Sequence, residues 1–151
     1  MKNYRHAFTM IELVFVIVVL GILAAIAIPK FAATRTDAEV SRVAQNIMIG
    51  AGDIAAYAVS SGKTEDNLSL MSNAIADLAS SGDAVLSTKK AEISMGSVSD
   101  CITIKIVRGT NDDNLTISEK SAVTDVKCLA LESTIDAAKY PMKLRGQNVI
   151  Y

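Results

Sequence analysis

The stretch Ala7-Phe8-Thr9-Met10-Ile11-Glu12, followed directly by the apolar run Leu13–Ile28, decides how this chain is organised. Of the 21 residues in Phe8–Ile28, 18 are apolar, and Leu13–Ile28 carries no charge. As a helix, Phe8–Ile28 would be about 31 Å long, which matches the roughly 30 Å hydrocarbon core of a bilayer. We therefore expect this segment to form a helix in a membrane.

The remainder of the chain has an ordinary composition. The sequence of 151 residues is 50% apolar and 21% charged, but from Pro29 onward only 55 of 123 residues are apolar, a fraction typical of globular domains. Its length fits one domain with an appendage. The net charge of −1 gives no electrostatic reason to expect direct binding to nucleic acid.

Three kinds of N-terminal segment share a basic start and an apolar run. A secretory signal peptide would account for Lys2, Arg5 and the small-x-small sequence Ala25-Ile26-Ala27. A plain membrane anchor is the second alternative. The third is a short cleaved leader, followed by a helix that stays in the membrane until it is packed into a polymer.

Glu12 favours the third alternative. A carboxylate in a membrane helix costs a few kcal/mol near the bilayer centre and less near its surface, and a signal peptide or plain anchor gains nothing from it. If the chain is cut between Ala7 and Phe8, a new α-amine lies near the same depth as Glu12. A charge pair between Glu12 and the Phe8 amine of a neighbouring subunit would neutralise both groups and set the axial register of a helical assembly.

The quoted stretch resembles the class III leader and cleavage/methylation motif of type IV pilins and type II secretion pseudopilins. Those families usually have Gly at the position of Ala7 and Leu at the position of Met10. The resemblance implies cleavage after Ala7 by a prepilin peptidase, N-methylation of Phe8 and an assembly role for Glu12.

The resemblance also implies an organisation and a location for the chain. Residues 1–7 would be the leader, 8–28 the transmembrane and assembly helix, and 29–151 a periplasmic pilin-like domain. The protein would cross the bacterial inner membrane once. Its partners would be an assembly platform and other pilin-like subunits, in a homo- or hetero-oligomeric filament.

Gly21 and Pro29 are expected to be points of flexibility in the N-terminal helix. Gly weakens a helix by roughly 1 kcal/mol relative to Ala, and Pro29 removes the hydrogen bond to the Ala25 carbonyl. In the resembling families the matching stretch can kink or melt in filaments. The alternatives are a tolerated membrane-helix glycine and a helix end at the membrane surface.

Residues 29–60 have helical spacing and are expected to form the amphipathic half of the same helix. Apolar residues recur every three or four positions, at Val40, Val43, Ile47, Ala51, Ile54 and Ala58. Gly50 and Gly52 are either tolerated or mark a close approach by a neighbouring segment. A breaker follows at Ser60-Ser61-Gly62-Lys63.

The rest of the sequence predicts short elements. Leu68, Met71, Ile75 and Leu78 indicate a second helix capped by Asp66 or Asn67, which Ser80-Ser81-Gly82-Asp83 ends. Residues 84–100 give no clear pattern, and a short strand or a loop is expected there. The later elements are a strand at Cys101–Arg108, a turn at Thr110–Asp113, an antiparallel strand at Leu115–Ile117, a helix at Val126–Lys139 that Pro141 ends, and edge strands at Met142–Arg145 and Asn148–Tyr151. Together they predict an α+β fold of the type IV pilin-like kind, with the long helix packed on a small antiparallel sheet.

The two cysteines, Cys101 and Cys128, are expected to form a disulfide. An extracytoplasmic domain lies in an oxidising compartment, and the bond would contribute roughly 3–4 kcal/mol in the chain-entropy model. Two separate buried thiols are the alternative.

No catalytic constellation is visible, so we expect neither an enzyme nor a cofactor. His6, the only histidine, lies in the predicted leader, which excludes a His-based triad or a His-ligated zinc site in the mature domain. Asp112 and Asp113 are weak candidates for calcium ligands. The spacing of Asn111-Asp112-Asp113-Asn114 matches no recognised calcium loop, so a polar hairpin turn is preferred.

These features predict a structural subunit, a pseudopilin of a type II secretion-like periplasmic filament. Removing the leader leaves 13 basic and 16 acidic side chains. The small domain, with one clear hairpin and no long insertion, favours a pseudopilin over an adhesive pilin. The alternatives are a type IV pilus pilin for motility, adhesion or DNA uptake, and a secreted binding module with an ordinary signal peptide.

Overall fold

The computed structural model describes residues 8–109 and 113–144, apart from the side chains of residues 29–33. The chain divides into two units, Met1–Asp37 and Ala38–Tyr151. The helix α1 (Met10–Ser61) contributes residues to both units. The predicted long helix is confirmed, and its backbone is helical at Gly21 and Pro29 as well.

In the second unit, the amphipathic half of α1 supplies one wall of the core. Its inward face is fully buried and recurs every three or four residues, as the sequence predicted. These buried residues are Val43, Ile47, Ala51, Ile54 and Ala58. The core that they enter is a single cluster, which also contains residues of every helix and strand from α2 to α3.

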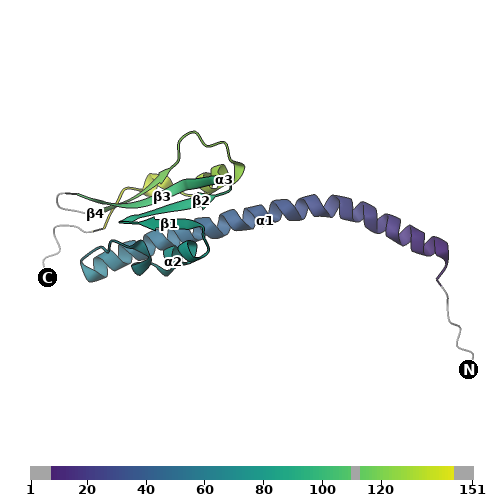
Figure 1. Cartoon of the computed structure of the whole chain (residues 1–151), viewed down its shortest axis with the longest axis horizontal. Coiled ribbons are helices and arrows are strands. Elements are labelled where there is room, and N and C mark those ends of the chain that lie inside the picture. The colour runs from purple at the N-terminus through teal and green to yellow at the C-terminus, as the bar shows by residue number, and fades with distance from the viewer. Residues whose placement is uncertain (1–7, 110–112, 145–151) are drawn as a thin grey trace, which may run out of the picture. The chain divides into compact units, whose positions relative to one another are not determined.

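The other wall is an antiparallel sheet of five strands in the order β1-β2-β3-β4-β5, of which Figure 1 labels the first four. The strands are β1 (Ala84–Ser87), β2 (Lys90–Met95), β3 (Val98–Arg108), β4 (Asp113–Glu119) and β5 (Met142–Lys143). The expected strand at 101–108 is confirmed as most of β3, and its alternate residues Ile102, Ile104 and Ile106 are buried. The α+β layout expected from the pilin resemblance is therefore present.

The segment 84–100, for which a short strand or a loop was expected, holds more strand than that. The segment 84–100 contains β1, β2 and the start of β3. In β2 the buried positions are Ala91, Ile93 and Met95, a period-two pattern weakened by the small side chain of Ala91. The turn between β1 and β2 has Lys89 in the left-handed region, at φ 56°, where Gly or Asn would have given a clearer hairpin signal.

The expected second helix is two separate pieces. A 3₁₀ turn, η1 (Leu68–Leu70), is capped by Asn67, and the helix α2 (Asn73–Ser80) is capped by Ser72. The Ser72 hydroxyl accepts a hydrogen bond from the Ala74 N–H at 3.1 Å and donates one to Asp53 Oδ2 at 2.8 Å. Because a serine cap needs non-helical backbone at its own position, Ser72 interrupts the helix that the apolar spacing predicted.

The predicted helix at 126–139 was also too long. The helix α3 (Val126–Thr134) ends before Ile135, whose backbone is extended, and η2 (Ala137–Lys139) follows. The hydroxyls of Ser133 and Thr134 both donate to the Ala130 carbonyl at 2.8 Å. Side chains that bond to nearby carbonyls offer the backbone an alternative to helix, which accounts for the early end.

Two further expectations concern the hairpin and the C-terminal strands. Asp113 is the first residue of β4, so the prediction that it belongs to the turn was wrong. Met142–Lys143 forms the expected edge strand. The predicted strand Asn148–Tyr151, together with Thr110, Asn111, Asp112 and Arg145, lies outside the described residues.

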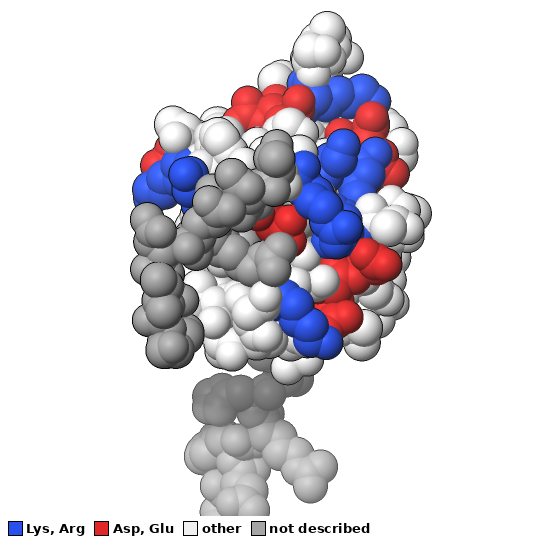
Figure 2. All heavy atoms as spheres, turned by 90° about the vertical axis from the view of Figure 1, so that its left-hand side faces the viewer, with Lys and Arg blue, Asp and Glu red and all other residues white. Residues whose placement is uncertain are grey.

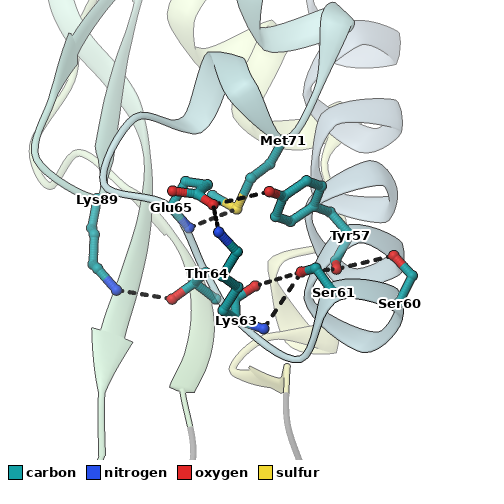
Figure 3. Close-up of polar contacts among 8 residues, drawn as sticks. All are labelled: Tyr57, Ser60, Ser61, Lys63, Thr64, Glu65, Met71 and Lys89. Carbon is teal, nitrogen blue, oxygen red and sulfur yellow. Dashed lines mark hydrogen bonds and ion pairs between the residues drawn. The ribbon is translucent and has the colours of Figure 1, made fainter.

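The C-terminal end of α1 is fastened by a network of polar contacts, drawn in Figure 3. The Tyr57 hydroxyl donates to Glu65 Oε1 at 3.0 Å, and Lys63 Nζ lies 2.8 Å from the same oxygen. Thr64 Oγ1 accepts a hydrogen bond from Lys89 Nζ at 2.8 Å. The residues that follow α1 are thereby tied back to the helix and across to the β1–β2 turn.

The two glycines of the amphipathic half differ in their surroundings. A Cβ at Gly50 would lie 2.6 Å from Ile75 Cδ1 and 2.8 Å from Ile75 Cγ1, whereas a Cβ at Gly52 would meet no atom within 4 Å. Because Ile75 is fully buried, it has little room to move. Gly50 therefore permits close packing of α2 on α1, while Gly52 is merely tolerated.

Gly50→Ala is expected to lower the free energy of unfolding relative to Gly52→Ala, which is the matched control. Both changes gain roughly 1 kcal/mol of helix propensity, but only the methyl at Gly50 overpacks the core, at a cost of about 1–3 kcal/mol. Urea unfolding of the full-length chain in detergent, followed by circular dichroism, measures both. Equal stabilisation of the two variants would show that Ile75 yields without cost.

Candidate functional site

The N-terminal apolar segment is the most unusual surface of the described chain. Met10–Ile28 is long and apolar enough to cross a membrane, with a mean hydropathy of 3.1, and none of it is buried within the chain itself. Length and composition alone would also fit a signal sequence near the N-terminus. Such a continuous apolar surface requires lipid or other protein around it.

Thr9 and Glu12 form a capping box at the start of α1. One carboxylate oxygen, Glu12 Oε2, accepts hydrogen bonds from the Thr9 N–H at 2.8 Å and from the Thr9 hydroxyl at 2.7 Å. The Glu12 N–H in turn donates to Thr9 Oγ1 at 3.3 Å. This reciprocal arrangement satisfies two N–H groups that have no partner inside the helix.

The capping role of Thr9 was not predicted, although the sequence contains its signal, Thr-x-x-Glu. Through the capping box, the Glu12 carboxylate points toward the N-terminus of α1 and contacts Thr9. Thr9 is the residue next to Phe8, which is exposed. That orientation is compatible with the expected charge pair to a neighbour's Phe8 amine, which stays a prediction. Ala7, on the other side of the expected cleavage site, lies outside the described residues.

The expected flexibility at Gly21 and Pro29 also stays a prediction, because it concerns helices packed in a filament. A Cβ at Gly21 would meet no atom within 4 Å. Among the residues that the structure describes, no contact therefore requires a glycine at this position. The Pro29 side chain is not among those described.

Cys101 and Cys128 are joined by a disulfide that links β3 to α3. Their Cα atoms are 5.7 Å apart, with a sequence separation of 27, and both residues are fully buried. The carboxylate of Glu132 lies close to the two sulfur atoms, and these three are the one group of potential metal ligands found among the described residues. Because the sulfurs are bonded to each other, neither is a thiolate that could bind a metal.

A second link between the sheet and α3 runs through Asp125, the N-cap of α3. Its carboxylate accepts hydrogen bonds from the Ser97 N–H at 3.0 Å and the Ser97 hydroxyl at 2.8 Å, and from the N–H groups of Lys127 and Cys128. These bonds, led by that from the Ser97 N–H, lower the pKa of Asp125 to about 2. Gly96 is in the left-handed region at φ 62°, and a Cβ there would lie 2.3 Å from Asp125 Oδ1.

The lowered pKa of Asp125 predicts a loss of stability in acid. Since the pKa is about 2 in the folded chain against 3.8 for the ordinary group, the stabilisation is complete above about pH 4 and is lost as the pH falls toward 2. The variant Asp125→Asn is expected to flatten this part of the stability profile. Unfolding midpoints at several pH values between 2 and 6 would test it, and an unchanged slope would contradict it.

The weak calcium candidate fits a structural role better. Asp113 is buried in β4 and accepts a hydrogen bond from the Thr64 hydroxyl at 2.6 Å, with Arg108 Nε 3.9 Å from its other oxygen. Its carboxylate therefore joins the segment after α1 to the sheet. Asp112, the other candidate, lies outside the described residues.

Comparisons with known proteins identify only the N-terminal part of the chain. Searches of curated proteins and of solved structures return no match. Residues 2–28 do match a family model, that of the prokaryotic N-terminal methylation motif. That match places in this chain the class III prepilin signal of type IV pilins and pseudopilins, the family that the residues around Phe8 and Glu12 resemble.

Proposed function

We propose that this chain is a pseudopilin, a structural subunit of a short periplasmic filament in a type II secretion-like machine. A prepilin peptidase removes residues 1–7 and methylates the new N-terminus at Phe8. The apolar segment then holds the subunit in the inner membrane, with the second unit in the periplasm, until the filament takes it up.

The observation that carries this proposal is the methylation motif at residues 2–28 in front of an unburied apolar helix. The motif supports a type IV pilin-like subunit that assembles with other pilin subunits, and it points to a structural role instead of an enzymatic one. The apolar helix and the motif together support anchoring in the inner membrane with a periplasmic domain.

The choice of a pseudopilin over a pilus pilin is supported by the short connections between the strands of the domain. The strands β1 to β4 follow one another with connections of at most four residues. From β1 to β4 the sheet therefore carries no long insertion for display on a surface fibre, and the longer β4–β5 connection contains α3 and η2. A disulfide between β3 and α3 suits an oxidising periplasm.

Mass spectrometry of the mature protein tests the processing. The expected N-terminus is N-methyl-phenylalanine at residue 8. A mature chain that begins at Ile28, after the small-x-small sequence, would contradict the proposal and indicate an ordinary secreted protein.

Deletion of the gene, combined with electron microscopy, tests the kind of machine. We expect loss of export of a secreted protein, with the subunit confined to the cell envelope. Long surface fibres that contain this chain, with export unaffected, would identify a pilus pilin instead.

A further inference from the structure

One carboxylate of the second unit lies against the disulfide and not against a cation. Acidic and basic side chains lie beside one another on the face of this unit that Figure 2 shows. The unit contains ion pairs such as that of Lys63 with Glu65, 2.8 Å apart. Glu132 makes no ion pair among the described residues. Its Oε1 atom instead lies 3.7 Å from Cys128 Sγ.

The position of Glu132 beside the disulfide follows from its spacing along α3. Cys128 and Glu132 are four residues apart in this helix, so their side chains lie on the same face, one turn from each other. An oxygen of Glu132 and the two Sγ atoms of the disulfide all lie within 4.8 Å of one another. Because both cysteines are fully buried and Glu132 is half-buried, salt screens the charge of this carboxylate only weakly at the sulfurs.

The basic side chains near the disulfide are paired with other anions. Lys127, in the first turn of α3, lies 2.8 Å from Glu39. Lys120, whose backbone N–H donates to the carbonyl of the disulfide cysteine in β3, pairs with Asp100. Within the part of the chain that the structure describes, the negative charge of Glu132 is therefore not compensated by either lysine.

Reduction of the disulfide by a small thiol, RSH, brings a further negative charge to this place. The thiolate RS⁻ attacks one Sγ and forms an RS–Sγ bond, while the bond between the cysteines breaks and its electron pair leaves on the other sulfur as a thiolate. A second RS⁻ attacks the RS–Sγ bond, which releases RSSR and the second cysteine thiolate. The two cysteine thiolates take up the two protons that the RSH molecules lost. The cysteines are thereby reduced, and the small thiol is oxidised to RSSR.

The charge of Glu132 opposes the first attack at either sulfur. If Cys101 is attacked, the departing thiolate is that of Cys128, beside the carboxylate. If Cys128 is attacked, RS⁻ itself must approach the carboxylate. Like charges at this separation disfavour the charged form, so both routes are slowed. We propose that Glu132 protects the Cys101–Cys128 disulfide from thiol exchange, most strongly from thiols that carry a further negative charge. The inference is independent of the proposed filament function, because it concerns the disulfide alone.

Because both sulfurs are fully buried, a thiol reaches them only when α3 opens away from the sheet. Glu132 and Cys128 move together in such an opening, since both belong to the same helix. The Asp125 carboxylate, which accepts hydrogen bonds from the N–H groups of Lys127 and Cys128, keeps the first turn of that helix capped. The charge therefore stays beside the sulfur of α3 during the attack, whereas a charge on β3 would be left behind.

Glu132→Gln, which keeps the size of the side chain and removes its charge, tests the inference in the oxidised full-length chain in detergent. Two small thiols are compared: cysteamine, which carries an ammonium group, and 2-mercaptoethanesulfonate, which carries a sulfonate. Released cysteines are alkylated and counted by mass spectrometry, and each rate is expressed per thiolate. The ratio of the two rates within one protein cancels the opening of α3, so a purely structural effect of the substitution leaves the ratio unchanged. Asp77→Asn, which removes an exposed carboxylate on α2, is the matched control.

In the wild type we expect cysteamine to react faster than 2-mercaptoethanesulfonate, and we expect Glu132→Gln to lower the ratio of the two rates at least about threefold. Asp77→Asn should keep the wild-type ratio. The same ratio in the wild type and in Glu132→Gln would overturn the inference, whatever happens to the absolute rates. An equal fall in Asp77→Asn would also overturn it, because the effect would then come from the net charge of the domain and not from the carboxylate beside the sulfurs.

Discussion

Glu12→Val is expected to abolish filament assembly while leader cleavage after Ala7 continues. In the membrane the Glu12 carboxylate is costly unless it is paired. The expected partner is the α-amine that cleavage creates on Phe8 of a neighbouring subunit. Removing the carboxylate leaves that amine as an unpaired charge in an apolar surrounding, which costs several kcal/mol at every contact. We expect at least a tenfold loss of sheared filaments.

The capping box complicates this variant, because Glu12 also accepts hydrogen bonds from Thr9 within its own chain. Two further variants separate the roles. Glu12→Gln keeps a hydrogen-bond acceptor for the Thr9 N–H but removes the charge. Thr9→Ala removes the capping hydroxyl, at a cost of about 1 kcal/mol, but keeps the charge.

If the charge drives assembly, Glu12→Gln behaves like Glu12→Val, and Thr9→Ala forms filaments in nearly normal amounts. If the capping hydrogen bonds drive assembly instead, Thr9→Ala loses filaments and Glu12→Gln forms them in nearly normal amounts. Immunoblots of sheared filaments, with mass spectrometry of the N-terminus as the control for processing, decide between the two. Assembly by Glu12→Gln at wild-type levels would show that the intersubunit charge pair does not exist.

The parts of the fold that the sequence predicted share a strong local signal. The long helix has an apolar run and then a regular stripe, and β3 alternates isoleucine with polar residues. The parts that it missed depend on contacts distant in sequence. The left-handed Lys89 in the β1–β2 turn donates its N–H to the Asp66 carbonyl at 2.6 Å, and no local pattern encodes that bond.

The same distinction between local signals and contacts distant in sequence applies to the residues of the candidate site. Phe8 and Glu12 could be picked out because the motif is contiguous in sequence, and the family model matches the same stretch. The link from Ser97 to Asp125 spans 28 residues, so only the folded sheet reveals it. Asp113 looked like a turn residue because it follows Asn111 and Asp112, whereas its buried position is set by Thr64, 49 residues away.

Replacing both cysteines, as Cys101→Ala with Cys128→Ala, is expected to lower the free energy of unfolding by about 3–4 kcal/mol, the chain-entropy value for a loop of this size. The disulfide closes a segment with a sequence separation of 27 and joins β3 to α3. It restricts the unfolded chain, so its removal favours unfolding even where native packing survives. Both residues are fully buried, and alanine adds no polar group to the core.

The consequence for the filament follows from the small reserve of stability in a domain of this size. A loss of 3–4 kcal/mol removes a large part of that reserve, so the double variant should be degraded in the periplasm and assemble poorly at 37 °C. Urea unfolding of the oxidised and dithiothreitol-reduced wild type, beside the double alanine variant, measures the effect. The reduced wild type and the variant should have similar midpoints, both well below that of the oxidised chain. If all three midpoints agreed, α3 would be held to β3 by Asp125 and the core, and the disulfide would add nothing to the fold.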